Sequence, residues 1–497
     1  MQGIFLSSMK FRKLLLMRFL NIYLIGIFIG LTGCKNISSS VVDSVFFGGE
    51  IINPKGDEVI FYSRDGKISD TLKLDNNNRF QKKFASIETG VYYFRHGSEI
   101  QLIIIEPNDS IMIRLNTYDF DKSLVFSGNG AKKNNYLLKT YNQNDRNNRK
   151  LVKHSDKEPE VFEAFVNKRH QKQLEDFNRF TENKKISEYA KSIIKANIDY
   201  NIYADKEIYP FAYFGENKMV HVKDLPESFY AFRDNIDYNA DHLSENFAYK
   251  RYLFFHFDNM AVNYFYNNNE FHSKFDRHEL SYNKAKLELI DSLVQNEIIK
   301  NNLLKYKTRA FVNSSNSQDD INEVMASYLS KTTSEEDIKY MNGLIASLDN
   351  LKPGKGLPDI NIINVNNEEY TIADVVNKPT LIYFWSTNTK KHYKNSHYRV
   401  KELKAQFPKM GFMSININDN PDKFWKETIN QYKFDLNNEY RFKNPKEALQ
   451  TLAVNYLYKV IIVDRKANII NPNVNIFSKD FEGKLNDMIQ KKELVLR

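Results

Sequence analysis

The chain has 497 residues, 42% of them hydrophobic and 27% charged, and its formal net charge is +9. This length suggests about three domains and is ample for buried cores. The charge falls to +5 without the four basic residues of segment 1–33, because that segment contains no acid. So small an excess, with no Lys/Arg cluster, argues against a nucleic-acid partner.

Residues 1–33 have the pattern of a lipoprotein signal peptide. Four basic residues come first: Lys10, Arg12, Lys13 and Arg18. An apolar run over 19–29 follows, and Leu31-Thr32-Gly33 leads to Cys34. This order predicts cleavage before Cys34 and attachment of lipid, with palmitate among the acyl groups, to its thiol. An uncleaved anchor is the alternative, but the run is short of the ~20 residues that a spanning helix needs.

Cys34 is the only cysteine of the chain. If its thiol carries lipid, the mature protein has no free thiol and no disulfide framework, so buried apolar area has to stabilise it. We therefore expect a protein of the cell envelope, anchored to a membrane by lipid after a linker over 34–44. It would face either the periplasm or the outside.

Residues 45–137 are predicted to form a β-rich domain, a sandwich or barrel of antiparallel strands. Short apolar or alternating runs recur with turn residues between them, at 44–52, 59–63, 79–84, 91–94, 101–106 and 111–115. Asn53-Pro54-Lys55-Gly56 and Pro107-Asn108-Asp109 are typical turns between such strands.

Two segments in this region resemble a known domain. They are Glu106-Pro107-Asn108-Asp109-Ser110-Ile111 and Phe126-Ser127-Gly128-Asn129-Gly130-Ala131, the second followed by Asn134, Tyr136 and Leu137. They resemble the β-rich domain of unknown function that precedes thioredoxin domains in many envelope lipoproteins. The resemblance covers about ninety residues, and it implies no activity.

Residues 138–350 are predicted to be a helical middle domain. Two sets of apolar residues at steps of three and four each indicate one helix face: Ile186, Tyr189, Ile193, Ala196 and Tyr200, and then Leu287, Ile290, Val294 and Ile298. Thr333 and Glu336 predict a capping box at the start of a further helix.

An aromatic-rich stretch over 247–271 has two interpretations. It is either a platform that stacks on sugar rings or peptide side chains, or a helix pair buried deep in the core, where aromatic rings supply a large area. The second is favoured, because no polar groups are placed to orient a ligand. The nearby His272, Asp276, His278 and Glu279 do not have the spacing of a recognised metal site, so we expect no metal and no cofactor.

Residues 351–497 alternate between strand and helix patterns, which predicts an α/β domain. A polar hairpin precedes the continuous apolar run 380–385, which is typical of a buried parallel strand. A helix through Val400 and Leu403, a strand over 411–417, a helix over 423–432 and strands at 459–464 and 469–470 are expected to follow.

This region resembles the TlpA and ResA group of membrane-attached thioredoxin-like disulfide reductases over about 140 residues. The matching motifs are Pro358-Asp359, Phe384-Trp385, Trp425 and Ile462-Val463-Asp464. The whole chain is thus expected to be a multidomain α+β protein with a β-sandwich or barrel-like N-terminal domain, a helical middle and a thioredoxin-like α/β domain.

The chain departs from this group at the reactive positions. The resemblance places the two redox cysteines at Thr389 and His392, with Lys390 and Lys391 between them, and the cis-proline at Tyr458. A thiolate is the nucleophile of disulfide exchange, and a threonine hydroxyl cannot replace it. A hydrolytic pair of Thr389 and His392 would need a carboxylate to orient the imidazole, and the sequence places none there.

Three lysines stand close to the predicted helix start. Lys390, Lys391 and Lys394 could bind an anion or an acidic partner together with the helix dipole, or they could simply be solvated. We expect a redox-inactive domain that binds a protein or peptide of the envelope, or acts as a scaffold. The alternative is a TlpA-like thiol-disulfide oxidoreductase, which the missing cysteines oppose.

Overall fold

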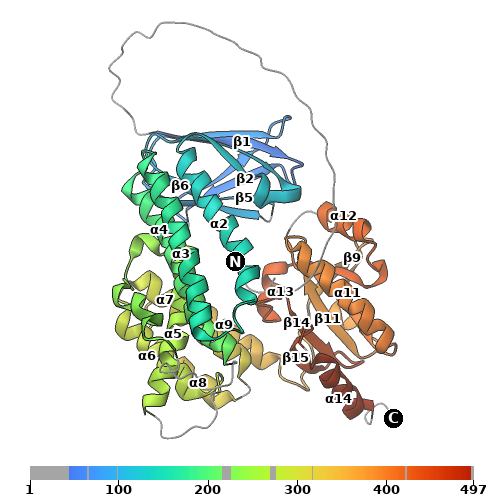
Figure 1. The fold of residues 1–497 in the computed structure, drawn as a ribbon. Helices are drawn as coiled ribbons and strands as arrows, with labels where there is room; N and C mark the ends of the chain where they lie inside the picture. Colours follow the sequence, from blue (N-terminus) through green and yellow to red (C-terminus); the bar gives the residue numbers. More distant parts are fainter. Residues whose placement is uncertain are drawn as a thin grey trace. The chain divides into compact units, whose positions relative to one another are not determined.

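The computed structural model describes residues 44–63, 66–97, 99–214, 225–268, 276–315, 317–419, 422–478 and 480–493. Cys34 and His272, and with them the predicted anchor, lie outside these ranges. The described residues fall into two compact units (Figure 1). The first holds residues up to Val152 apart from 97–99, and the second begins at Lys153.

The first unit is built from two four-stranded sheets. One has the strand order β4-β1-β7-β8 and the other β3-β2-β5-β6. The strands are β1 (Val45–Ile52), β2 (Glu58–Tyr62), β3 (Ser69–Lys73), β4 (Arg79–Phe84), β5 (Gly90–His96), β6 (Glu99–Ile105), β7 (Ser110–Asn116) and β8 (Val125–Asn129). Inward-facing residues of both sheets, among them Phe47 and Phe61, share one core.

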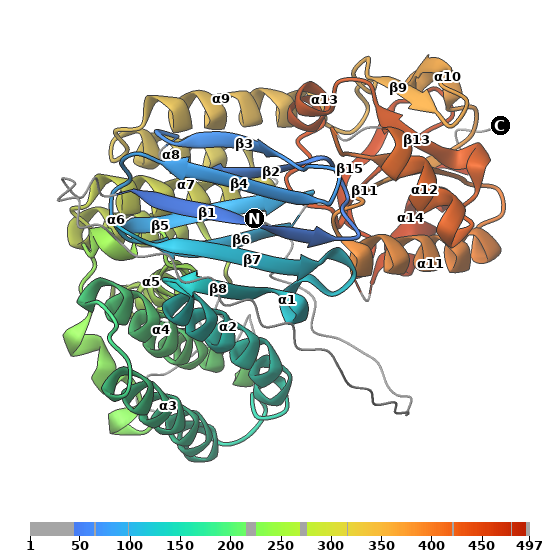
Figure 2. The same ribbon diagram turned by 90° about the horizontal axis from the view of Figure 1, so that it is seen from above.

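Six of these strands lie where the alternating patterns predicted them, but the pairing is not wholly antiparallel. β1 runs parallel to β7, with Phe47 opposite Ile111, and antiparallel to β4; Figure 2 shows β1, β7 and β8 side by side. Strands β3 and β8 escaped prediction because each is short and mostly polar or exposed.

Helix α2 (Ala131–Val152) ties the edges of the two sheets together. The Asn134 carboxamide bonds both backbone groups of Ile104 on the edge strand β6, at 2.7 and 2.9 Å. The next residue, Asn135, does the same for Phe126 on the edge strand β8, at 3.0 and 2.7 Å. The amides thus take the place of a neighbouring strand at two edges. By its contacts α2 belongs to this unit.

The motifs around Glu106 and Gly130 support the same helix. The buried Lys133 ammonium bonds the carboxylates of Glu106 and Asp109, each at 2.6 Å. Gly130, at φ 88°, lies so close that a Cβ would stand 2.4 Å from Asp109 Oδ1. These residues therefore have a structural role that the resemblance alone did not reveal.

The second unit begins with helices. They are α3 (Pro159–Glu182), α4 (Glu188–Tyr213), the 3-10 helices η3 (Glu227–Asn235) and η4 (Asp241–Leu243), α5 (Phe247–Asn268), α6 (Leu280–Leu293), α7 (Glu297–Ser314), α8 (Gln318–Leu329) and α9 (Glu335–Asn350). Ile193, Ala196 and Tyr200 of the predicted apolar face are buried on α4, but Ile186 precedes this helix, which begins at Glu188. The described part of the aromatic stretch forms the single helix α5 and not a helix pair. Tyr249, Tyr252 and Phe257 are fully buried there, as the core interpretation expects.

Two further helical expectations were wrong. The face proposed for Leu287 to Ile298 is interrupted, because α6 ends at Leu293 and Ile298 lies, 55% exposed, on α7. Helix α9 begins one residue later than the predicted capping box: Ser334, not Thr333, accepts the N–H of Asp337 at its start.

The rest of this unit is a seven-stranded mixed sheet with the order β10-β9-β13-β12-β11-β14-β15. Its strands are β9 (Asn361–Asn364), β10 (Glu369–Thr371), β11 (Thr380–Trp385), β12 (Gly411–Asn416), β13 (Glu439–Phe442), β14 (Lys459–Val463) and β15 (Ile469–Asn475). β11 is parallel to β12 and antiparallel to β14. The helices are α10 (Ile372–Val375), α11 (Lys390–Gln406), α12 (Asp422–Tyr432), α13 (Pro445–Thr451) and α14 (Phe481–Glu493).

The predicted alternation of strands and helices is present here, with additional elements. The sequence did not indicate β13, α10, α13, α14 or the short 3-10 helix η5 (Leu436–Asn438). Leu381 and Val460 of the sheet pack with Leu403 of α11 in one core, and Trp385 packs with Trp425 and Tyr393 in another. In the part of the chain that the structure describes, no helix is long and apolar enough to cross a membrane.

Candidate functional site

The loop after β11 positions the first two candidate residues. Every residue of β11 is buried, which anchors the loop. The carbonyl of Ser386 accepts both the backbone N–H and the hydroxyl of Thr389, each at 3.1 Å. Thr389 then occupies the N-cap of α11, but its side chain does not cap the helix. The predicted helix start is therefore present, and the Thr389 hydroxyl is bound to the loop.

His392 lies one turn into α11 and is buried, with 9% of its surface exposed. Burial lowers the pKa of the imidazole to about 4, although a hydrogen bond to the backbone of Leu457 acts to raise it. Ser396 Oγ lies 3.2 Å from Nε2 and donates to the His392 carbonyl at 2.9 Å. The imidazole is therefore neutral near pH 7 and joins α11 to the loop before β14.

Two aromatic rings close around His392. The ring centroids of His392 and Tyr458 are 5.2 Å apart, and those of Tyr458 and Phe477 are 5.6 Å apart. Phe477 also lies 6.1 Å from His392, and all three contacts are edge to face. We call His392, Tyr458 and Phe477 the aromatic cluster. Its rings link the start of α11 to the Tyr458 loop, and Phe477 remains 37% exposed.

Lys459, the residue after Tyr458, supports this loop from within. It is 1% exposed, and its ammonium donates to the carbonyls of Leu452 and Ala453 at 2.8 and 3.0 Å. Burial lowers its pKa to about 7. The bonds satisfy backbone carbonyls just beyond α13 and fix the segment that leads to Tyr458.

Two of the three candidate lysines are directed at Tyr432 of α12. Lys394 Nζ lies 5.5 Å from the centre of the Tyr432 ring. Burial acts to raise the pKa of the Tyr432 phenol, but hydrogen bonds with Tyr393 and Lys390 and the charges of Lys390 and Lys394 lower it. The lysines thus have an aromatic partner already, and Lys391 is exposed beside them.

A buried polar network beneath α11 escaped the sequence analysis. His397 Nε2 lies 2.9 Å from Glu439 Oε1, and the hydroxyl of Ser414 donates to Glu439 Oε2 at 2.9 Å. The imidazole stacks on Phe434, with ring centroids 3.5 Å apart. Ser414 and Glu439 are 0% and 2% exposed, so a substrate cannot reach them. The network joins α11 to β12 and β13. The one feature of the sequence that could have indicated it is Ser414, a polar residue within a mostly apolar strand.

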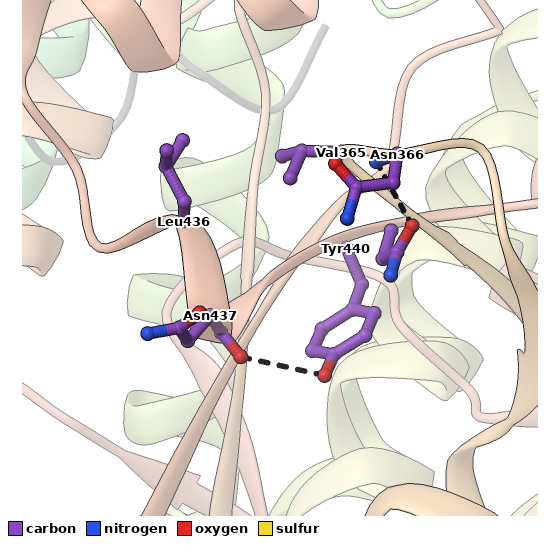
Figure 3. Close-up of a pocket in the computed structure, with 6 residues that line it drawn as sticks. Val365, Asn366, Leu436, Asn437 and Tyr440 are labelled. Atoms are coloured by element: carbon purple, nitrogen blue, oxygen red, sulfur yellow. Dashed lines mark hydrogen bonds between the residues drawn. The ribbon is translucent and has the colours of Figure 1, made fainter.

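A small cavity of 270 Å³ lies elsewhere on this sheet (Figure 3). Val365 and Asn366 of the β9–β10 turn stand on one side, Leu436 and Asn437 on the other, and the Tyr440 ring lies between them. Its lining contains no charged residue. No residue predicted from the sequence lines it.

The group His272, Asp276, His278 and Glu279, for which we expected no metal, lies only partly within the described residues. His278 is exposed and contacts Ser314 at 3.2 Å. Among the residues with a described placement, no three His, Cys, Asp or Glu side chains converge as a metal site would require.

No family model matches the chain, and no curated protein sequence matches it either. Solved structures of thioredoxin-fold proteins are similar to part of it. The thioredoxin domain of a thiol-disulfide oxidoreductase from Bacteroides vulgatus is 18% identical, with a TM-score of 0.24, over 28% of this chain and 97% of that one. A thiol:disulfide interchange protein from Bacteroides sp. is also 18% identical, with a TM-score of 0.24, over 28% of this chain and 90% of that one.

Proposed function

We propose that the protein is a lipid-anchored component of the cell envelope whose C-terminal domain binds a protein or peptide and performs no disulfide exchange. The observation that carries the proposal is the environment of His392. At a position where the resemblance expects a redox cysteine, a neutral imidazole is buried between Leu457, Ser396 and Tyr458. Such a group holds two segments together and presents no nucleophile to a disulfide.

Disulfide exchange also requires a cysteine sulfur, and neither Thr389 nor His392 supplies one. A mixed disulfide forms when a thiolate attacks one sulfur of a disulfide and expels the other. Cys34, the only cysteine of the sequence, precedes the residues that the structure describes and is the proposed lipid site. The oxidoreductase and interchange activities named above belong to those other proteins.

The partner would bind on the outer side of the aromatic cluster. The rings already contact one another between α11 and the Tyr458 loop, so an extended peptide would lie across them. The part-exposed Phe477 ring offers apolar contact area there, and aromatic residues dominate many protein interfaces. The lysines at the start of α11 would contact acidic groups of the same partner.

Site-specific photo-crosslinking in intact envelopes tests this surface. A photoreactive phenylalanine analogue at position 477 of the full-length protein should give a discrete crosslinked species. The same analogue at position 436 is the matched control, because Leu436 is an exposed apolar residue of the same domain, away from the cluster. Capture of the same species from both positions, or from neither, would contradict binding at the cluster.

A further inference from the structure

A second cavity lies within the helical part of the second unit, between α3, α4 and η3. Its volume is 240 Å³. Polar side chains line it from all three helices: Glu163, Asn167 and His170 from α3, Tyr203 and Lys206 from α4, and Ser228 from η3. Residues 163, 167 and 170 are spaced by four and three, so they form one stripe of α3 facing the cavity.

A buried ion pair stands at one end of this cavity. The Lys206 ammonium donates to Glu163 Oε1 at 2.9 Å, and the two side chains are 6% and 9% exposed. The Ser228 hydroxyl lies 3.2 Å from each oxygen of the same carboxylate. An ammonium has three donors and a carboxylate about four acceptor positions. Both groups therefore keep hydrogen-bonding capacity for a ligand beside them.

The other end is polar as well. His170 Nε2 lies 2.7 Å from Asp199 Oδ1, which leaves Nδ1 without a partner among the described residues. Burial raises the pKa of Tyr203 to about 12, so its hydroxyl stays protonated and can donate. The Tyr203 ring stacks on Phe232, with centroids 4.4 Å apart, which fixes the position of that hydroxyl.

The charge balance of the lining indicates which ligand fits. The one carboxylate and the one ammonium of the lining pair with each other, and His170 pairs with Asp199. A charged ligand would lose its hydration without meeting an unpaired opposite charge. A neutral ligand avoids this cost. A hydroxyl group both donates and accepts, so adjacent hydroxyls can bond Glu163 and Lys206 together.

The size of the cavity limits the ligand further. Its volume equals that of about eight water molecules in the liquid, and it is below the range of cavities for drug-sized ligands. One sugar ring or a comparable polyol fits this space. Ile202, Ala231 and Phe232 supply apolar lining for the C–H faces of such a ring.

We propose that the cavity between α3, α4 and η3 is a binding site for a neutral, hydroxyl-rich ligand of monosaccharide size. Glu163 and Lys206 bond adjacent hydroxyls at one end, and Tyr203, Asn167 and His170 bond those at the other. This site is independent of the aromatic cluster and of the partner proposed for it.

Calorimetric titration of the purified full-length protein tests the proposal. The probes are neutral hexoses and N-acetylhexosamines, with zwitterionic amino acids and inorganic phosphate as the comparison ligands. At least one neutral sugar should bind, and raising the salt concentration should leave its affinity unchanged, because no net charge is involved. Zwitterionic amino acids should not bind. Phosphate has a separate candidate site at the lysines at the start of α11, so any binding of phosphate should be the same in wild type and in variants of this cavity.

Two mild variants locate the binding. Tyr203→Phe removes one hydroxyl and keeps the stacked ring, and Asn167→Ala removes an exposed carboxamide. Each should weaken sugar binding about fivefold to tenfold, the effect of one lost hydrogen bond. Tyr306→Phe on α7 and Asn178→Ala on α3 are the matched controls, since both residues lie outside the cavity, and they should leave binding unchanged.

The thermal unfolding temperature of each variant tells whether weaker binding comes from the loss of one contact to the sugar or from a destabilised fold. Weakened binding in a variant that unfolds at the wild-type temperature supports the site. The proposal is overturned if no neutral sugar binds, if an amino acid binds in its place, or if Tyr203→Phe and Asn167→Ala bind sugar as well as the controls do.

Discussion

The rings of His392 and Tyr458 meet edge to face with their centroids 5.2 Å apart. The resemblance to thioredoxin-like reductases assigns these two positions to a redox cysteine and to the cis-proline that faces it. The structure brings the two residues together, and the contact between them is aromatic. The described part of the chain thus places these two segments next to each other, with a contact between two rings at the positions that the resemblance assigns to the cysteine and the proline.

The buried state of His392 predicts a pH dependence of stability. Its pKa is about 4 in the folded protein, against an ordinary value of 6.5. The unfolded chain therefore binds a proton between these values that the folded chain does not, and stability is lost as the pH falls from 6.5 toward 4. The loss from this one group is up to about 3 kcal/mol.

A comparison of variants isolates this effect from other acid-sensitive groups. His392→Phe should lower the free energy of unfolding at pH 7, because it loses the bond to Leu457, and its deficit relative to wild type should shrink as the pH falls to 5. The exposed His278→Gln is the control and should follow wild type throughout. A deficit that stays constant with pH would show that His392 titrates normally.

Asn134 and Asn135, whose carboxamides bond the edge strands β6 and β8, give a second prediction. Asn134→Ala should destabilise that unit by about 2 to 4 kcal/mol, because it leaves the buried N–H and C=O of Ile104 without partners. Asn135 is only half-buried, so water can replace its carboxamide, and Asn135→Ala should cost about 1 kcal/mol. The exposed Asn77→Ala should change stability by less than about 0.5 kcal/mol.

Hydrogen exchange measured by mass spectrometry reports this result locally. In Asn134→Ala the peptide that covers β6 should exchange faster than in wild type, whereas the peptide that covers β2, inside the same sheet, should change less. Equal exchange of β6 in both proteins would mean that Asn134 does not protect this edge.

The resemblance to thioredoxin-like reductases located two of the three residues of the aromatic cluster, His392 and Tyr458, because strong local signals lie near them. β11 is an unbroken apolar run, so the reactive positions of the resemblance could be counted forward from this strand. Tyr458 could be counted back from the apolar strand β14 in the same way. The ring contacts could not be predicted, because the sequence does not tell which side chains of these segments meet, and two of the three contacts involve Phe477, which follows the last strand.

The polar sites of the interior were missed for a different reason. Periodicity predicts that a helix has a buried face, but it does not tell which helices face each other. Glu163 and Lys206 belong to polar stretches of α3 and α4 and look like surface residues in the sequence. Only the packing of α3 against α4 and η3 buries them. The same limit applies to Glu439, which meets His397 only in the folded sheet.

The lysines at the start of α11 give a third prediction. Replacing Lys390, Lys391 and Lys394 together by Gln should weaken the binding of phosphate, sulfate or an acidic peptide, and binding to wild type should fall as salt rises. Calorimetry at low salt measures both. Because Lys390 and Lys394 are directed at Tyr432, we expect weak binding. Wild-type protein that binds no anion at low salt would leave these lysines as solvated partners of Tyr432.

The proposed anchor gives a fourth prediction. Cells fed labelled palmitate should incorporate the label into wild-type protein and not into Cys34→Ser, and the variant should leave the membrane fraction or be mislocalised. The acyl chains are what hold such a protein at the bilayer. An unlabelled wild type, or a variant that still carries the label, would refute lipid attachment at Cys34.

The most direct test of the central claim is an assay of disulfide reduction by the purified full-length protein. With dithiothreitol as the electron donor, the reduction of insulin or a small disulfide should proceed at the rate of buffer alone, because neither position 389 nor position 392 holds a sulfur. The double variant Thr389→Cys/His392→Cys should show at most partial activity, since Tyr458 remains where the proline is expected. Catalytic reduction by the wild-type protein would contradict the account of a redox-inactive binding domain.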